Sequence, residues 1–251
     1  MREKQHLMKT SGPILWTWLG RIGYSEALIL MESLMGRVEK MEIPGVLLFL
    51  EHPPIITLGR RAGPEDVVAT QDELVKSGFR VFPADRGGMA TCHGPGQLIG
   101  YVVIHLGRLG LGIRNFVEKL ECMIINVLAS MGVKGISVEG MPGVWVQGKK
   151  IAALGMRVKD HITSHGFALN VDFNLNAFNF VVPCGMKEIK VANLSELLDV
   201  IPSLPELARI TAKAFGADFG VEMIEIKEIG MNAEWNEFIE SDGARKKGEA
   251  A

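Results

Sequence analysis

The sequence predicts an α/β or α+β fold in which helices pack on a mixed β-sheet. Strand-like and helix-like stretches are mixed along the chain without strict alternation, which is typical of this class. No internal repeat, low-complexity block or Ser/Pro/Gly-rich linker divides the 251 residues, and 47% of them are hydrophobic and 22% charged, as in globular proteins. We therefore expect one domain over residues 1–240, followed by a charged, flexible tail over residues 241–251.

The first third of the chain predicts a strand, a helix and two more strands. Period-two alternation puts Trp16 and Trp18 on one face, as in a strand. An apolar stripe at i, i+3, i+4 and i+7 predicts an amphipathic helix that Pro44-Gly45 ends. The predicted elements are a strand at Ile14–Leu19, a helix at Tyr24–Val38, and strands at Val46–Leu50 and Ile55–Leu58.

The middle of the chain contains a glycine-rich stretch between two strands and the strongest helix pattern. Gly78 stands where a left-handed C-cap would end a short helix. Cys122 lies beside the apolar stripe of the long helix, so we expect it to be a buried small hydrophobe. The predicted elements are a helix at Asp72–Ser77, strands at Phe79–Pro83 and Leu98–Leu106, and a helix at Asn115–Met131.

The last part of the chain predicts three strands, a helix and a final strand. The helix follows Pro202, which cannot continue a preceding element. The predicted strands are Gly143–Val146, Lys150–Val158, Gly166–Val171 and Phe219–Ile226, and the predicted helix is Leu204–Phe215.

Charge and cysteine usage exclude several classes of function. The net charge is 27 − 29 = −2, so no global basic field would attract nucleic acid or an anionic membrane. The cysteines Cys92, Cys122 and Cys184 are odd in number and form no Cys-x-x-Cys pair, which argues against a zinc or dithiol site and favours a reducing compartment. There is no signal-peptide pattern and no apolar run long enough to span a bilayer, so we expect a cytosolic protein without a metal.

The first candidate for chemistry is the stretch DRGGMATCHGPGQ at residues 85–97. Four glycines would let the backbone approach a ligand closely, and Arg86, Thr91 and His93 would supply polar groups. The pattern matches neither the P-loop nor the dinucleotide-binding fingerprint. A long hairpin loop built from turn residues remains the alternative.

Three further positions carry reactive side chains, each with a structural alternative. Cys184 stands between proline and glycine, so a turn could expose its thiol as a nucleophile, although most free cysteines are buried. Lys150 precedes an apolar strand, where it is either part of a solvated turn or drawn into a pocket beside a thiol. His165 opens an apolar strand and is more often structural than catalytic there.

Taken together and in this order, these motifs resemble those of the LipB family of octanoyltransferases in lipoate synthesis. The resemblance runs from about Trp16 to Phe215 and is highly specific. It rests on the motifs EHPPIITLGRR at 51–61, RGGMATCHGPGQL at 86–98, GVWVQGKKIAALGMRV at 143–158, HGFALNVD at 165–172 and PCG at 183–185.

The resemblance implies the catalytic-domain fold of biotin and lipoate protein ligases, and a transfer reaction without any cofactor. An octanoyl group would pass from acyl carrier protein to a lysine on lipoyl domains, both of 2-oxoacid dehydrogenase E2 subunits and of the glycine cleavage H protein. Cys184 would form the acyl thioester, and Lys150 would be its acid/base partner. The substrate-binding residues that the resemblance implies are Arg86, Gly87, Gly88, Met89, Ala90, Thr91, Cys92, His93, Ala153, Leu154, Gly155, Gly166, Phe167 and Ala168.

Two features depart from this pattern or remain open. The family usually has tyrosine where this chain has Cys92, which would leave a second thiol beside the acyl pocket. Arg60-Arg61 with Arg86 could form a landing patch for the acidic carrier protein, and a monomer is the simpler expectation. The alternatives are an ATP-dependent lipoate or biotin ligase of the same fold, or a non-catalytic module that binds the acyl carrier.

Overall fold

The computed structural model describes residues 12–182 and 189–227. Its main element is an eight-stranded mixed sheet with the order β11-β1-β2-β6-β10-β9-β8-β7, and a second, three-stranded sheet has the order β4-β3-β5. In the large sheet β1 runs parallel to β2 and β11, and the other neighbours are antiparallel.

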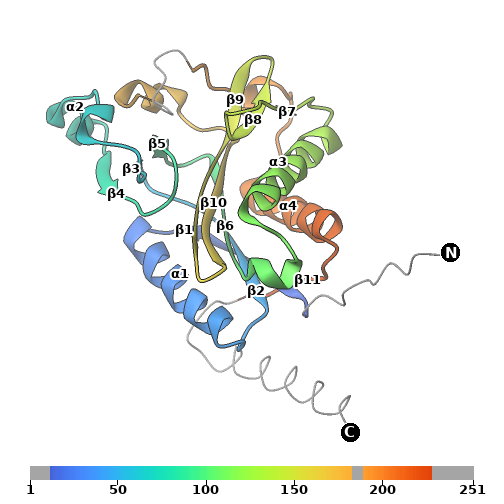
Figure 1. Cartoon of the computed structure of the whole chain (residues 1–251). Helices are drawn as coiled ribbons and strands as arrows, with labels where there is room; N and C mark the ends of the chain where they lie inside the picture. The colour runs from blue at the N-terminus through green and yellow to red at the C-terminus, as the bar shows by residue number, and fades with distance from the viewer. Residues whose placement is uncertain (1–11, 183–188, 228–251) are drawn as a thin grey trace, which may run out of the picture.

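The elements follow one another along the chain in the order that their numbers give (Figure 1). The strands are β1 Ile14–Arg21, β2 Gly45–Glu51, β3 Ile55–Leu58, β4 Arg80–Pro83, β5 Ala90–His93, β6 Gln97–Ile104, β7 Ile136–Ser137, β8 Gly143–Val146, β9 Lys149–Lys159, β10 Ile162–Asn170 and β11 Met223–Glu225. The α-helices are α1 Tyr24–Glu39, α2 Gln71–Lys76, α3 Ile113–Ser130 and α4 Leu204–Phe219. Short 3₁₀ helices span Pro64–Asp66, Leu106–Leu109, Leu175–Phe180 and Leu194–Glu196.

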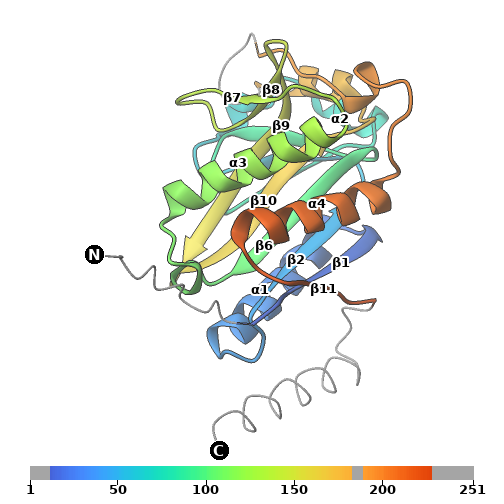
Figure 2. The same cartoon turned by 90° about the vertical axis from the view of Figure 1, so that its right-hand side faces the viewer.

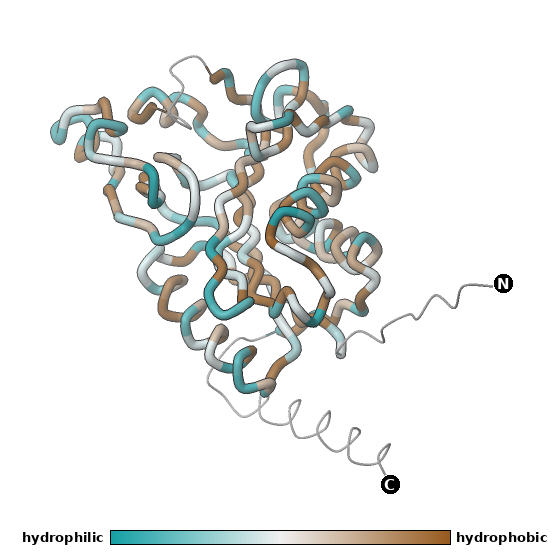
Figure 3. The backbone as a smooth tube through the Cα atoms, viewed as in Figure 1, coloured by the Kyte–Doolittle hydropathy of each residue, from teal (hydrophilic) through white to brown (hydrophobic). Residues whose placement is uncertain are grey.

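Helices cover both faces of the large sheet, which confirms the predicted fold class. Figure 2 shows α3 and α4 lying side by side across one face, while α1 lies behind the sheet. The small sheet and α2 lie beyond the end of α1 at which Tyr24 begins the helix (Figure 1). The central strands β2, β6 and β10 are buried along almost their whole length, and in Figure 3 the helices that cover them show hydrophobic and hydrophilic colours in alternation.

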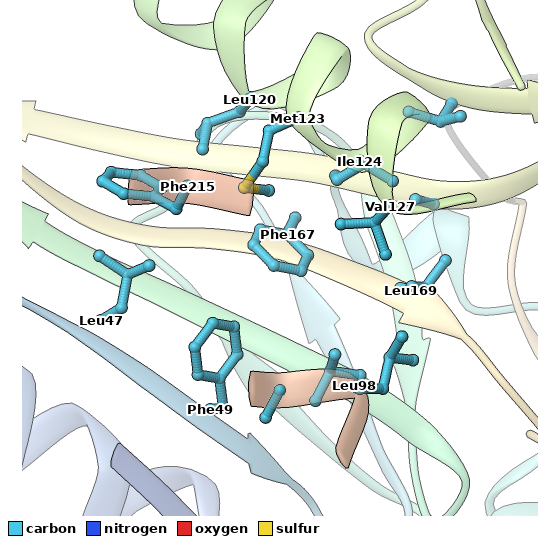
Figure 4. Close-up of a cluster of buried hydrophobic side chains, with 14 of the residues drawn as sticks. Leu47, Phe49, Leu98, Leu120, Met123, Ile124, Val127, Phe167, Leu169 and Phe215 are labelled. Atoms are coloured by element: carbon cyan, nitrogen blue, oxygen red, sulfur yellow. The ribbon is translucent and has the colours of Figure 1, made fainter. Parts of the chain in front are cut away.

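The two faces have separate hydrophobic cores. Under α3 and α4, aromatic side chains from the sheet interlock with the apolar stripe of α3: Phe167 lies close to Phe49 and below Met123 and Ile124 (Figure 4). The other core lies under α1, which contributes Met31 and Leu34 among its buried residues. Removing a side chain of this size from water stabilises the fold by about 1.5–3 kcal/mol.

The structure corrects three of the interpretations drawn from the sequence. The helix α4 runs on to Phe219, where a strand was expected, because the Phe215 and Phe219 rings stack with centroids 4.1 Å apart and Gly220, with a φ of 67°, then ends the helix. The strand that follows is therefore only Met223–Glu225. The glycine-rich stretch is not one loop, because β5 runs through it and pairs with β3.

Cys122 is the third correction. It is exposed, and its neighbour Glu121 is buried instead. A step of about 100° per residue turns Cys122 away from the stripe formed by Leu120 and Met123. The expected tail over residues 241–251 lies outside the described residues.

Candidate active site

A cavity of about 470 Å³ lies where the glycine-rich stretch meets β9 and β10. Thirteen of the sequence-predicted substrate residues line it together with Lys150. These are Arg86, Gly87, Gly88, Met89, Ala90, Thr91, His93, Ala153, Leu154, Gly155, Gly166, Phe167 and Ala168. Cys92 does not line the cavity, and Cys184 lies outside the described residues.

Small residues from two neighbouring strands form part of the cavity wall. Ala153 on β9 is paired with Ala168 on β10, and Gly155 is paired with Gly166. A methyl group added to Gly155 would stand 3.1 Å from Arg86 Cδ, so the absence of a side chain lets the loop pack directly onto the strand. The Gly87 N–H donates to the Met156 carbonyl over 2.8 Å and fixes the loop there.

Arg86 is a buried anchor of the loop and does not belong to a surface patch. Only 8% of it is exposed, and its guanidinium donates from Nη2 to the Thr57 carbonyl and Oγ1, both at 2.7 Å. This corrects the expected landing patch, because a buried guanidinium cannot meet a protein partner. Arg60 and Arg61 are exposed, and their backbone N–H groups donate to the carbonyls of Arg86 and Gly88.

Three histidines, His52, His93 and His165, and two tyrosines surround Arg86, and all of these rings except that of His52 line the cavity. Burial lowers the pKa of His52 to about 4 and that of His93 to about 3, with further lowering at His93 from the charges of His52 and Arg86. Burial raises the pKa of Tyr24 to about 12 and that of Tyr101 well above its usual range. At neutral pH these rings are therefore uncharged, and Arg86 is the fixed charge among them.

Lys150 is buried in the lining of the cavity, with 6% of its surface exposed. Its Nζ lies 5.3 Å from the centroid of the Trp145 ring, a cation–π distance. Glu121 accepts a 2.7 Å hydrogen bond from the Gly143 N–H. Burial raises the pKa of Glu121, while that hydrogen bond and the charge of Lys150 oppose the rise. The lysine is thus held in a pocket and is not part of a solvated turn.

Gly143 makes room for the Lys150 side chain. Its φ is 136°, and a Cβ at this position would stand 2.3 Å from Lys150 Cε and 2.5 Å from the Ala152 carbonyl oxygen. No other residue type fits both this backbone conformation and this contact.

The backbone of Lys150 pairs with the chain that follows Cys184. The Lys150 N–H donates to the Lys190 carbonyl over 2.8 Å, and the Ala192 N–H donates to the Lys150 carbonyl over 3.0 Å. Val182 and Ile189, the described residues on either side of Cys184, line one groove with Lys149. The backbone of Lys150 is thus paired with the residues that follow the segment carrying Cys184.

A buried chain of hydrogen bonds joins the Arg86 region to this pairing. His93 donates from Nδ1 to Gln97 Oε1 over 2.7 Å, and its Nε2 accepts from the Thr57 hydroxyl that also binds Arg86. Gln97 donates to Asn170 Oδ1 over 2.8 Å, and Asn170 donates to the Ala192 carbonyl over 3.1 Å.

The described cysteines are not placed for catalysis. Cys92 is buried, its Sγ donates to the Ala177 carbonyl, and burial raises the pKa of its thiol. It lies on β5 of the small sheet and shares a hydrophobic cluster with Ile56 and Ala90. No group of three His, Cys, Asp or Glu side chains in residues 12–182 and 189–227 is arranged to hold a metal ion, and no helix in this part of the chain is long and apolar enough to cross a membrane.

Sequence reasoning missed several residues of this site. Tyr24 and Tyr101 line the cavity, and Gln97 and Asn170, which stand in recognised motifs without a role assigned to them, support it. His165 was expected to open a strand and to be structural, but it lies inside β10 and lines the cavity. Glu121 had a usable signal, because a carboxylate between Leu120 and Met123 stands on the edge of an otherwise apolar stripe.

Known proteins are similar to this chain in sequence and in fold. The sequence pattern of the lipoyl protein ligase A/B catalytic domain matches residues 23–216. A protein named octanoyltransferase from Caldicellulosiruptor saccharolyticus is 41% identical over 207 residues, which cover 82% of this chain and 88% of the relative. Another from Alkaliphilus metalliredigens is 36% identical and covers 84% of this chain and 97% of the relative.

A solved structure has the same fold at much lower sequence identity. It belongs to a bi-partite lipoate protein ligase from Thermoplasma acidophilum, with a TM-score of 0.68 and 19% identity, and the match covers 93% of this chain and 91% of that one. Octanoyltransferases are acyltransferases, so the relatives give the class of enzyme. The chain belongs to the lipoyl protein ligase A/B catalytic domain family and is an acyltransferase of that family.

Proposed function

We propose that this enzyme transfers an octanoyl group from acyl carrier protein to a lysine of a lipoyl domain, through an acyl thioester on Cys184. Relatives named octanoyltransferase support the acyl group. The main structural support for this mechanism is the position of Lys150. This lysine is buried in the cavity lining, and its backbone is paired with the residues that follow Cys184.

The first step exchanges one thioester for another. The Cys184 thiolate attacks the octanoyl carbonyl carbon and forms a C–S bond, and the bond to the phosphopantetheine sulfur of the carrier breaks. The departing thiolate takes the proton of the Lys150 ammonium and leaves as a thiol, so Lys150 is neutral when the second step begins. Because a thioester replaces a thioester, the step needs no ATP. The ammonium of Lys150 favours the thiolate form of a nearby cysteine.

The second step forms an amide. A free lysine amine has a pKa of about 10.4, so the acceptor lysine must lose a proton before it attacks the acyl-enzyme. Lys150 in its neutral form accepts that proton, and the Cys184 sulfur leaves as the new C–N bond forms. Lipoyl domains of E2 subunits and of the glycine cleavage H protein are the proposed acceptors.

The cavity supports an acyl chain as the bound group. Ala153, Ala168, Leu154 and Phe167 give it apolar walls, and His93 in its lining and the adjacent His52 are uncharged. Burying about six methylenes at about 0.8 kcal/mol each contributes about 5 kcal/mol of binding free energy. Arg60 and Arg61 are exposed beside the loop, and we propose that they meet the acidic surface of the carrier protein.

The discriminating experiment offers the purified enzyme two donors in parallel. Octanoyl-acyl carrier protein without ATP should modify a lipoyl domain, while octanoate with ATP should not. Lys150→Ala should reduce the rate by orders of magnitude with the fold intact. Modification only with octanoate and ATP would instead establish a ligase, and binding of the carrier without any transfer would establish a non-catalytic module.

A further inference from the structure

A second cavity, of about 490 Å³, lies beside the first. It is bounded by α1, by the end of β4 and by the hairpin ends of β9 and β10. Its apolar wall comes mainly from Leu28, Met31, Met35 and Ile162, and polar residues line the rest. Nothing in the proposed reaction uses this space.

His165 separates the two cavities. Among the described residues it alone lines both of them. Only 3% of its side chain is exposed, and its ring lies edge-on to Tyr101 with centroids 5.8 Å apart. The imidazole is therefore part of a common wall.

The imidazole is fixed in this position by its neighbours. His165 Nε2 donates to Asp85 Oδ1 over 2.7 Å, and the other carboxylate oxygen of Asp85 pairs with Arg157 Nη1. The φ of His165 is 58°, a left-handed conformation that side chains rarely adopt. Strain of this kind persists only where the surroundings hold it, and it is concentrated at functional sites.

The charge of the ring suits an apolar neighbour. Burial lowers the pKa of His165, and the hydrogen bond and charge of Asp85 oppose that effect only in part. The groups that face it are Asp85, Arg86, Arg157 and Tyr101, and a pKa below the ordinary value of histidine favours the neutral ring at physiological pH. A neutral ring can border a hydrocarbon chain without the cost of a buried charge.

Building on the proposed acyl transfer, we propose that His165 limits the length of the acyl chain by closing the first cavity against the second. An extended octanoyl chain is about 9 Å long, given C–C bonds of about 1.5 Å. Two residues of a strand advance about 6.6 Å. If the carbonyl of the octanoyl group lies beside Ala153, near Lys150, its methyl end lies just past the paired residues Gly155 and Gly166. At that point the His165 side chain blocks a longer acyl chain.

The test removes the imidazole at a backbone position that accepts glycine. His165→Gly relieves the left-handed strain and should join the two cavities, and His165→Asn is a smaller change that can keep the bond to Asp85. The matched control is His161→Gly: His161 has a similar φ of 64° and lines neither cavity.

Octanoyl- and dodecanoyl-acyl carrier protein compete for the enzyme in one mixture, and mass spectrometry reads the acyl products on a lipoyl domain. Since each buried methylene is worth up to about fourfold in binding, the dodecanoyl-to-octanoyl ratio should rise at least about tenfold in His165→Gly. It should rise less in His165→Asn and stay unchanged in His161→Gly.

The possible failures are distinguishable. If folded His165→Gly transfers octanoate with an unchanged chain-length ratio, the proposed partition is wrong while the proposed function stands. If it loses transfer of both chains equally, His165 serves the chemistry and not chain length. If the unaltered enzyme transfers no octanoyl group from the carrier, the proposed function itself fails.

Discussion

Asn170 donates a hydrogen bond from Nδ2 to the Ala192 carbonyl, across a distance of 3.1 Å between the two atoms. Ala192 in turn donates its N–H to the Lys150 carbonyl. One buried amide on β10 therefore fixes the segment that pairs with the proposed acid/base lysine.

Asn170→Asp should lower kcat by about fivefold or more, because it removes the donor and sets a carboxylate against a carbonyl oxygen, a change worth about 1–3 kcal/mol. KM for the acyl donor should change much less, since the cavity wall is intact. Thr163→Val is the matched control: Thr163 is equally buried on β10, where its hydroxyl donates to the Val102 carbonyl. If Asn170→Asp and Thr163→Val lost the same amount of kcat and of unfolding free energy, Asn170 would have only a structural role.

Gly143→Ala should slow the reaction by displacing Lys150. The added methyl would overlap Lys150 Cε and the Ala152 carbonyl at a φ of 136°. Gly148→Ala provides the comparison, because Gly148 also has a positive φ, of 75°, but has no atom within 4 Å of an added Cβ. Steady-state kinetics and chemical denaturation would be measured on both. Unchanged kcat in a folded Gly143→Ala variant would show that the exact position of the lysine is unimportant.

Acid should destabilise the protein through its buried histidines. The folded pKa of His52 is about 4, against about 6.5 in the unfolded chain, so the unfolded state binds the proton first as pH falls. The neutral His52 ring therefore contributes its full share to the free energy of unfolding above pH 6.5. This share, about 3 kcal/mol, is lost as the pH falls to 4. Urea unfolding at intervals between pH 7 and pH 4.5 would measure this loss. His52→Gln should flatten the curve, and an identical curve for this variant would assign the loss to other groups.

Arg60→Glu with Arg61→Glu should raise KM for octanoyl-acyl carrier protein by about tenfold at low salt, with the difference shrinking as salt is added. The arginines are exposed and rigidly attached to the loop that carries Arg86. Reversing Arg114 and Arg209, which are exposed elsewhere, makes the same change in net charge. If both pairs raise KM alike, only net charge matters and there is no local docking surface.

The sequence predicted what depends on local patterns. Apolar periodicity located α1 and α3 to within two residues at each end, and β2 to within one. It missed β5, because this four-residue strand is flanked by glycines and is held by its partner β3, far back in the chain. It also placed Cys122 inside and overlooked Glu121, since adjacency to a stripe in sequence is not adjacency on a helix.

The candidate site was also predicted only in part. The sequence motifs identified the residues that line the cavity, but they did not identify the hydrogen bonds that hold those residues in place. Asn170 bonds Gln97 from 73 positions away, and His165 bonds Asp85 from 80 positions away. Contacts of that range are set by strand register, which no local pattern in the sequence specifies.

Intact-protein mass spectrometry tests the acyl-enzyme mechanism most directly. The enzyme is mixed with octanoyl-acyl carrier protein without ATP or acceptor, and the adduct is mapped to a cysteine. We expect one octanoyl group on Cys184, its loss on addition of a lipoyl domain, and no adduct in Cys184→Ser. Cys92, which is buried, and Cys122, which is exposed on α3 away from the cavity, should stay unmodified. An adduct on either of these, or transfer by Cys184→Ser at the full rate, would contradict the proposed mechanism.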